Sequence, residues 1–207
     1  SGYQNYIIKT RGEYMDYNKS QIDRILEKLS RIDYIKPGEI PNIELYMDQV
    51  TTFMDSHLAH SKRREDDKIL TKTMINNYAK NRLLPPPFKK KYTKDHMFLL
   101  IFIYYLKSFL SINDIQSLMA PVNDKYFGSK NGVSLEDVYE EVFSMEDRQL
   151  DALIQDVKQK FEAAGGTFDS LPEEEQGPMR IFSFICALAF DVYEIKQIIE
   201  SLIDALT

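Results

Sequence analysis

The sequence has few of the features that mark secreted, membrane-bound or catalytic proteins. It contains a single cysteine, Cys186, which excludes an internal disulfide and a zinc site built from several cysteines. No stretch reaches the run of about 18 apolar residues that a membrane-spanning helix needs. A leader with a basic start and an apolar centre is also missing. We therefore expect a cytoplasmic protein that makes no use of a membrane.

Motifs for catalysis are missing as well. The sequence has no glycine-rich phosphate loop and no nucleophile elbow. His57 and His60 have a spacing that can bind a metal, but no cysteine lies near them and the neighbouring carboxylates form no ligand pattern. Cys186 lies in the apolar run IFSFICALAF and is expected to be buried. We expect neither an enzyme nor a metal site, and no cofactor.

Charge is unevenly distributed along the chain, whose formal net charge is −6. Residues 60–96 carry eleven Lys and Arg against four Asp and Glu, a local charge of +7. Residues 121–207 carry seven against eighteen, a local charge of −11. A basic stretch inside an acidic protein is typical of a surface that meets nucleic-acid phosphates. The alternative is a solvated basic surface that binds nothing.

Apolar residues at helical spacing predict a protein that is mostly α, without a multi-stranded sheet. Residues 97–106 are apolar throughout, which predicts a buried core helix because ten residues cannot span a bilayer. Pro121 is expected to end one helix and Ser144 to restart another. We expect an irregular arm over 3–17, a loop over 167–178, and helices over about 18–33, 43–57, 71–80, 93–106, 111–119, 134–164 and 179–205.

The stretch from Leu70 to Tyr92 is the most informative part of the basic region. Thr71 is a good N-cap for a short helix whose apolar side holds Met74, Ile75 and Tyr78. Asn81 can adopt the left-handed conformation that ends a helix. The polar side of the helix consists of Lys72, Thr73, Asn76, Asn77 and Lys80. Three prolines and the lysine run Lys89, Lys90 and Lys91 follow, which predicts an extended segment and a basic loop.

Several sequence blocks in this region resemble the winged helix-turn-helix head of MerR-type regulators. Leu70 and Thr71 stand at the first apolar and capping positions, and Leu83-Leu84-Pro85 matches the family's Leu-Leu-Pro. Lys90-Lys91-Tyr92-Thr93 is similar to the end of the wing, and residues 110–115 to the start of the next helix. The whole chain also resembles a family of Firmicute proteins that carry such a head in an α-helical frame. The resemblance covers about fifty residues and implies a transcriptional regulator, a repressor.

This resemblance implies which residues meet double-stranded DNA. The recognition helix would face the major groove, the wing lysines would contact phosphates, and tyrosine hydroxyls would reach the DNA backbone. For Tyr78 and Tyr92 the alternative is packing in the core. The residues expected at the DNA are Thr71, Lys72, Thr73, Asn76, Asn77, Lys80, Lys89, Lys90, Lys91 and Tyr92.

The expected architecture is a MerR-like winged helix-turn-helix domain embedded in an α-helical bundle. We expect an N-terminal arm and helix over 1–41, the DNA-binding domain over 42–120, and an acidic helical domain over 121–207 that forms a homodimer. The sequence specifies no small-molecule effector. Thr73, Asn76 and Arg82 stand where the family has Arg, Arg and Gly, so the alternative is a protein-interaction module whose degenerate helix-turn-helix no longer binds DNA.

Overall fold

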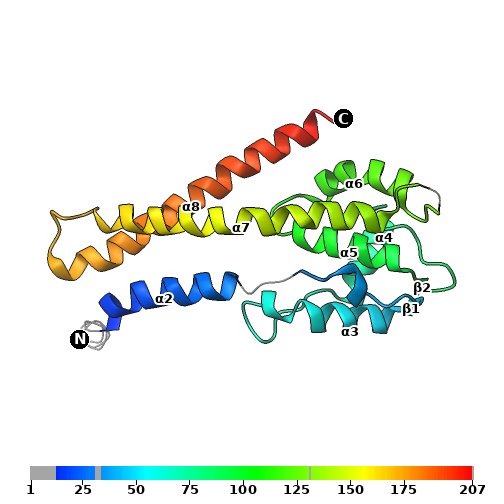
Figure 1. Cartoon of the computed structure of the whole chain (residues 1–207), viewed down its shortest axis with the longest axis horizontal. Helices are drawn as coiled ribbons and strands as arrows, with labels where there is room; N and C mark the ends of the chain where they lie inside the picture. The colour runs from blue at the N-terminus through cyan, green and yellow to red at the C-terminus, as the bar shows by residue number, and fades with distance from the viewer. Residues whose placement is uncertain (1–12, 31–33, 131, 207) are drawn as a thin grey trace. The chain divides into compact units, whose positions relative to one another are not determined.

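A computed structural model describes residues 13–30, 34–130 and 132–206, and this part of the chain is mostly helical. Figure 1 shows long and short helices with one pair of short strands, which confirms the expected α-rich fold. The α-helices are α2 (Glu13–Leu29), α3 (Met47–His57), α4 (Lys72–Lys80), α5 (Lys94–Leu106), α6 (Ile112–Tyr126), α7 (Leu135–Gly165) and α8 (Glu173–Asp204). The remaining elements are the 3-10 helices η1 (Pro37–Glu39) and η2 (Ala59–Ser61) and the strands β1 (Leu45–Tyr46) and β2 (Lys91–Tyr92).

The chain divides into two compact units. The first unit contains Ser1–Asp33 and Glu146–Ile195, and the second contains Tyr34–Met145 and Lys196–Thr207. The long helices α7 and α8 each begin in one unit and end in the other. The three domains expected from the sequence do not coincide with these units, because neither expected boundary falls at a unit limit.

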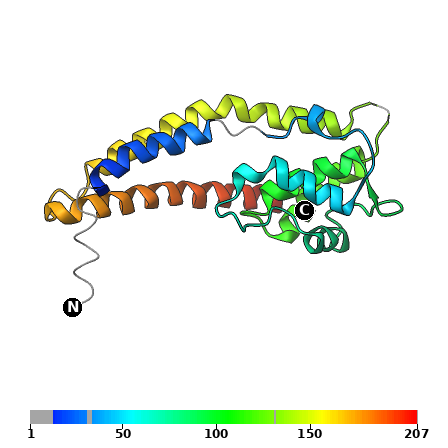
Figure 2. The ribbon, with the colours of Figure 1, turned by 90° about the horizontal axis from the view of Figure 1, so that it is seen from below.

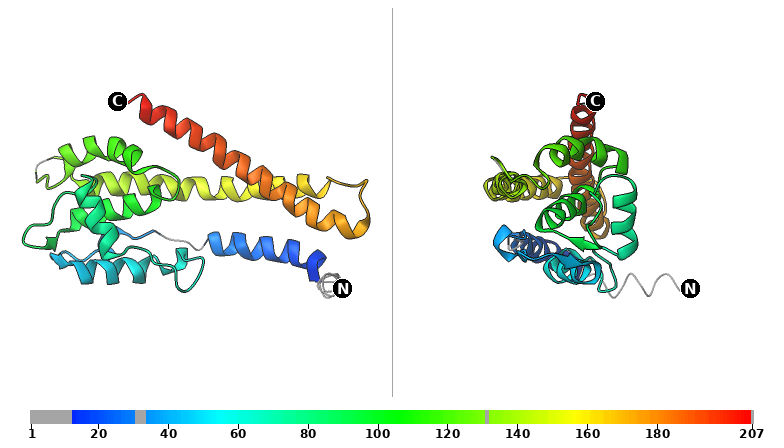
Figure 3. Two further views of the ribbon diagram at one scale, coloured as in Figure 1. Left: turned by 180° about the vertical axis from the view of Figure 1, so that it is seen from behind. Right: turned by 90° about the vertical axis from the view of Figure 1, so that its right-hand side faces the viewer.

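The second unit is built around α5. Met97, Phe98, Leu99, Leu100, Ile101 and Ile103 of this helix are buried. In the end-on view of Figure 3, α5 lies between α3 and α6. Tyr139 of α7 stacks against Phe98, with ring centroids 4.7 Å apart, and its hydroxyl donates a 2.6 Å hydrogen bond to the Ile35 carbonyl. The predicted core helix is therefore confirmed, although Phe102 and residues 104–106 are only partly buried.

The two strands form an antiparallel pair that joins the start of α3 to the end of the basic loop. Leu45 pairs with Tyr92, and Tyr46 pairs with Lys91. Leu45 and Tyr92 point inward and are buried. Because Leu45 and Tyr46 are held in this pair, α3 begins at Met47 and not near residue 43 as expected. The Tyr46 amide donates to the Gln49 side chain at 2.8 Å, which caps the helix there.

In the first unit, α7 and α8 run in opposite directions, joined by the turn after Gly165 (Figure 2). Phe161 of α7 and Phe184 of α8 meet edge to face with centroids 5.3 Å apart. Lys160 of α7 forms an ion pair with Asp191 of α8 at 2.9 Å. These contacts place the side of α8 that carries Phe184 and Asp191 against α7.

Two expected breaks in the C-terminal half are wrong. Ser144 does not restart a helix, because its hydroxyl donates to the Glu141 carbonyl at 2.8 Å within a continuous α7. Pro121 lies inside α6 and does not end it. Val122 and Tyr126 pack against the core beyond the proline, and this burial offsets the lost backbone hydrogen bond.

Two helices begin earlier than the sequence indicated. Helix α8 starts at Glu173, inside the expected loop, where three glutamates occupy its positive N-terminal end. Helix α2 starts at Glu13, within the expected irregular arm, and ends at Leu29; residues 1–12 and 31–33 lie outside the described residues. Of its expected apolar face, Leu26 is buried and Ile25 is exposed. None of the helices in the described chain is both long and apolar enough to cross a membrane.

Candidate nucleic-acid interface

Helix α4 has one buried and one exposed side. The Thr71 hydroxyl accepts a hydrogen bond from the Met74 amide at 3.2 Å, so Thr71 is the N-cap that the sequence predicted. Ile75 and Tyr78 are buried in the core of the second unit. The residues expected on the polar side are all exposed, namely Lys72, Thr73, Asn76, Asn77 and Lys80. The helix thus offers two amides, a hydroxyl and two ammonium groups to solvent.

The C-terminal end of α4 is closed by Arg82 and not by Asn81. Arg82 has a left-handed φ of 59°, and the Leu83 amide donates to the Tyr78 carbonyl at 2.9 Å. The Arg82 amide donates to the Ala79 carbonyl at 3.2 Å, which completes a Schellman motif. An arginine at this position is less stable than a glycine, because its Cβ is crowded when φ is positive.

The basic loop is a tight hairpin turn. The Lys91 amide donates to the Phe88 carbonyl at 2.9 Å, and the two residues pair as an antiparallel bridge. Between them Lys89 and Lys90 have φ values of 49° and 64°. Positive φ at both central residues is the signature of a type I′ turn, where Asn-Gly is preferred. Both lysines are exposed, so the turn holds two ammonium groups in solvent at the cost of backbone strain.

The two tyrosines pack in the core. Tyr78 is 5% exposed and Tyr92 is 3% exposed. Burial raises the pKa of both hydroxyls. Tyr92 is therefore a core residue, which favours the packing alternative, and its expected contact with DNA stays a prediction. Its place in the strand pair makes it a support for the turn that carries Lys89 and Lys90.

His96 is a buried polar residue beside the turn. Its Nδ1 accepts a 3.0 Å hydrogen bond from the Thr93 amide, which caps the start of α5. Its ring meets Phe127 edge to face with centroids 4.8 Å apart. Nε2 has no hydrogen-bond partner among the described residues. Burial lowers the pKa of His96, and the nearby carbonyls of Pro85 and Pro86 and the Asp95 carboxylate only partly oppose this shift.

Two ion pairs bring α4 and the turn close to the same short segment. Lys72, the first residue of α4, pairs with Asp48. Lys91 lies 3.4 Å from Glu44, and its Nζ lies 5.8 Å from the centre of the Tyr46 ring. The start of α4 and the base of the turn therefore converge on residues 44–48. The sequence does not indicate that this acidic segment belongs to the site, since a charge count shows no spatial pairing.

Four exposed cations lie at the end of α4 and in the turn. Lys80, Arg82, Lys89 and Lys90 form no ion pair with any residue that the structure describes. The Lys89 ammonium lies 5.2 Å from the centre of the Phe88 ring, which is 69% exposed. In the separate cluster Lys62–Arg64, Lys62 pairs with Asp55 at 2.7 Å, and the Asp67 carboxylate accepts from the Arg63 and Arg64 amides at 3.1 and 2.9 Å. Free positive charge is thus found at the end of α4 and at the turn.

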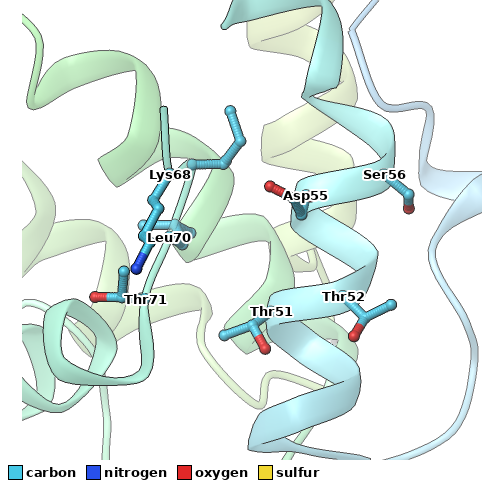
Figure 4. Close-up of a pocket in the computed structure, with 8 residues that line it drawn as sticks. Thr51, Thr52, Asp55, Ser56, Lys68, Leu70 and Thr71 are labelled. Atoms are coloured by element: carbon cyan, nitrogen blue, oxygen red, sulfur yellow. The ribbon is translucent and has the colours of Figure 1, made fainter. Parts of the chain in front are cut away.

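An open pocket of about 400 Å³ lies beside the start of α4 (Figure 4). In Figure 4 the Asp55 carboxylate points from α3 toward the segment that carries Lys68 and Thr71. Lys107 holds this segment through a 2.9 Å hydrogen bond to the Ile69 carbonyl, and burial lowers the pKa of Lys107. Six of the eight lining residues carry a hydroxyl or a charge and the pocket is open to solvent, so it lacks the enclosed form of a cofactor site.

The other candidate sites from the sequence have ordinary roles. The His57 ring stacks on Phe53 with centroids 3.9 Å apart. Among the described residues no three His, Cys, Asp or Glu side chains gather as metal ligands. Cys186 is half-buried and does not have the fully buried position that its apolar surroundings suggested.

Comparison with known families agrees with the division into units. A family model described as a domain of unknown function, DUF1836, matches residues 35–142. The matched segment nearly coincides with Tyr34–Met145, the longer part of the second unit, and contains α4, the turn and the strand pair. No curated protein and no solved structure matches the chain. Because the family model covers more than half of the 207 residues, the chain belongs to the DUF1836 family.

Proposed function

We propose that this protein is a DNA-binding transcriptional regulator, a repressor, that reads double-stranded DNA with α4 and grips the backbone with the Lys89–Lys90 turn. The observation that carries the proposal is a strained hairpin turn with two exposed lysines, Lys89 and Lys90, that form no ion pair with any described residue. Backbone strain of this kind persists where the side chain has a use. In addition, a short polar helix is followed by a small hairpin, which is the order of elements in a winged helix-turn-helix of the MerR-like kind.

The exposed side chains of α4 suit the major groove. Asn76 and Asn77 can each donate and accept in a bidentate contact with adenine, and Lys80 can reach guanine or phosphate. The Thr71 cap leaves the helix N-terminus with free amides and a positive dipole end, which favours phosphate. Helix α4 is short, so the sequence specificity of binding depends on few base contacts and the affinity depends on contacts with phosphates.

Binding to DNA is tested by fluorescence anisotropy with a labelled duplex library at several salt concentrations. We expect the logarithm of the binding constant to fall linearly with the logarithm of salt concentration. Selection of bound genomic fragments would then give the operator sequence. Absence of binding at low salt, or binding that does not respond to salt, would contradict the proposal.

The turn offers a variant in which stability and binding change in opposite directions. Lys89→Asn with Lys90→Gly places the preferred residues at the two left-handed positions and should raise the free energy of unfolding by about 1–2 kcal/mol. The same variant removes two phosphate contacts and should reduce the salt slope by roughly 2. Urea denaturation and anisotropy measure the two effects. Lys89→Arg with Lys90→Arg is the matched control, since it keeps both charges and should retain binding.

A second candidate is a protein-interaction module, favoured by the aromatic groups around Lys91. Tyr46 is 53% exposed and pairs with Lys91 in the strand pair, while Phe88 bridges to Lys91 from the other side. Exposed aromatic groups beside a cation are typical of protein interfaces. This candidate predicts that Phe88→Ala abolishes capture of a partner and that DNA binding is absent at low salt.

A further inference from the structure

The first unit has almost no interior of its own. Of the side chains that the structure describes in it, only Leu26, Ala164 and Phe184 are buried. Several large apolar residues of its α8 segment are exposed by more than half, namely Phe182, Ile185, Phe190, Val192, Tyr193 and Ile195. A unit of this size normally needs a contiguous buried core to offset the entropy of ordering its chain. Among the residues that the structure describes, none covers these side chains of the α8 segment.

The exposed residues form a stripe with a regular spacing. Phe182, Ile185, Ala189 and Val192 follow one another at intervals of three, four and three, the spacing of paired helices. All four are exposed. The α8 stripe, as we call these four residues, lies away from Phe184, whose side of the helix packs on α7. The two charged residues between Pro178 and Tyr193 lie outside the stripe, since Arg180 pairs with Asp169 and Asp191 pairs with Lys160.

The area of the stripe and its neighbours fits a dimer interface. Five large side chains on or beside the stripe are exposed by about 60% and, with roughly 150–200 Å² of surface each, present on the order of 500 Å² of apolar area; they are Phe182, Ile185, Val192, Tyr193 and Ile195. A standard interface buries about 800 Å² per partner, of which somewhat more than half is apolar, or roughly 450 Å². An exposed apolar patch of this size is at the upper end of the range found on monomeric proteins.

We propose that the α8 stripe binds the α8 stripe of a second copy of this chain, in an antiparallel pair related by a two-fold axis. In the register that buries all four residues, Phe182 lies against Val192 of the partner copy and Ile185 against its Ala189. Large residues thus meet small ones, which allows close packing. The proposal does not rest on DNA binding.

The charges at the two ends of the stripe favour the antiparallel direction. Seven positions before Phe182 lies Glu175, in the acidic first turn Glu173–Glu175, and seven positions after Ala189 lies Lys196. In the proposed antiparallel register Lys196 of one copy lies opposite Pro178 of the other, within about one helical turn of Glu175. A parallel pair would place glutamate beside glutamate and lysine beside lysine, which is repulsive. The Lys196 side chain is 41% exposed, so it remains accessible although its Nζ lies 3.5 Å from the Glu200 carboxylate of the same helix.

The proposed register places Cys186 next to the two-fold axis, facing its counterpart. The first experiment therefore treats the full chain with a short bismaleimide and measures the mass of the product. A covalent dimer through Cys186 is expected, and Cys186→Ser should remove it. On that Cys186→Ser background, Met179→Cys mixed with Tyr193→Cys should cross-link as a heterodimer. Self-cross-linking of Met179→Cys alone would overturn the antiparallel pairing.

The second experiment measures the oligomeric state by sedimentation equilibrium at micromolar concentration. The wild type should be a dimer, and Ile185→Glu with Val192→Glu should raise the dissociation constant by roughly a hundredfold or more, because both substitutions occur in each copy. Ile198→Glu with Leu202→Glu is the matched control, as these residues are similarly exposed on α8 outside the stripe and should leave the dimer intact. Circular dichroism checks that both variants keep their helices.

A monomeric wild type would overturn the proposal and indicate that another protein covers the stripe. A dimer that survives in the Ile185→Glu, Val192→Glu variant would also overturn it. If that variant does not fold, cross-linking of the wild type at Cys186 still decides the outcome. Failure of DNA binding would leave these results unchanged, so the two proposals are tested separately.

Discussion

At the scale of single residues, basic side chains occupy the backbone positions that suit them least. Arg82, Lys89 and Lys90 are the non-glycine residues of the described second unit with positive φ. Each would be more stable as glycine or asparagine by about 1 kcal/mol. All three are exposed and lack an ion pair within the described chain, so nothing in the fold requires their charge. A ligand with negative charge is the simplest reason for this choice of residues.

His96 should make the stability of the second unit depend on pH. In the unfolded chain a histidine has its ordinary pKa near 6.5, whereas burial lowers the pKa of His96 in the folded protein. Above that ordinary value both states are neutral and the stability is fully present. As the pH falls below it, the unfolded state binds a proton that the folded state does not, and stability falls by up to about 1.4 kcal/mol per pH unit until the folded pKa is passed.

Urea denaturation between pH 8 and pH 5 measures this dependence. His96→Gln keeps an acceptor for the Thr93 amide and should flatten the curve over that range. His60→Gln is the matched control, since it removes a histidine outside the core. An unchanged slope in His96→Gln would show that other groups cause the dependence.

At the scale of elements, the sequence predicted the parts that local chemistry determines. The Thr71 cap, the buried Ile75 and Tyr78 and the exposed side of α4 follow from helical spacing alone. The strand pair was not predictable, because two residues give no alternation and the partners lie far apart in the chain. Pro121 failed as a break because Val122 and Tyr126 pack against the core beyond it, and Ser144 failed because its hydroxyl bonds back to the Glu141 carbonyl within α7.

The candidate site was predictable to a similar extent. The charge count located the basic region, but the pairing of Lys72 with Asp48 and of Lys91 with Glu44 depends on the folded chain. Tyr92 illustrates the same limit, since an aromatic hydroxyl at the end of a basic loop suits both backbone contact and core packing. Only the buried position of its partner Leu45 separates these alternatives.

The acidic residues of the segment 44–48, at the start of α3, should weaken the binding of the basic elements to DNA. Asp48 pairs with Lys72, and both side chains are well exposed, so the pair contributes only about 0.5 kcal/mol. Asp48→Asn would release Lys72 for a phosphate and should tighten DNA binding about two- to threefold at low salt. Glu162→Gln, an equal change of charge on the exposed part of α7, should leave the affinity unchanged. Equal effects of both variants in anisotropy would indicate a general charge effect instead.

At the scale of the molecule, a basic surface and an apolar surface lie in different units. The basic α4 and turn belong to the second unit, within the segment that matches the family. The α8 stripe belongs to the first unit, outside that segment. Within the chain the family domain thus carries the proposed DNA contact, and the surrounding helices carry the proposed self-association. Because each chain has one reading helix, α4, two chains are needed to present two reading helices to DNA.

Self-association should therefore be coupled to DNA binding when the DNA carries two half-sites. A dimer can engage both half-sites at once, and the second contact then forms at a high effective concentration, which should strengthen binding roughly a hundredfold over a single half-site. Ile185→Glu with Val192→Glu should bind a single half-site as tightly as the wild type and lose this advantage on the palindrome. Ile198→Glu with Leu202→Glu should retain it. If the Ile185→Glu, Val192→Glu variant kept full affinity for the palindrome, the two half-sites would be occupied without the α8 pair. The two DNA-binding heads would then act independently, which would contradict the coupling.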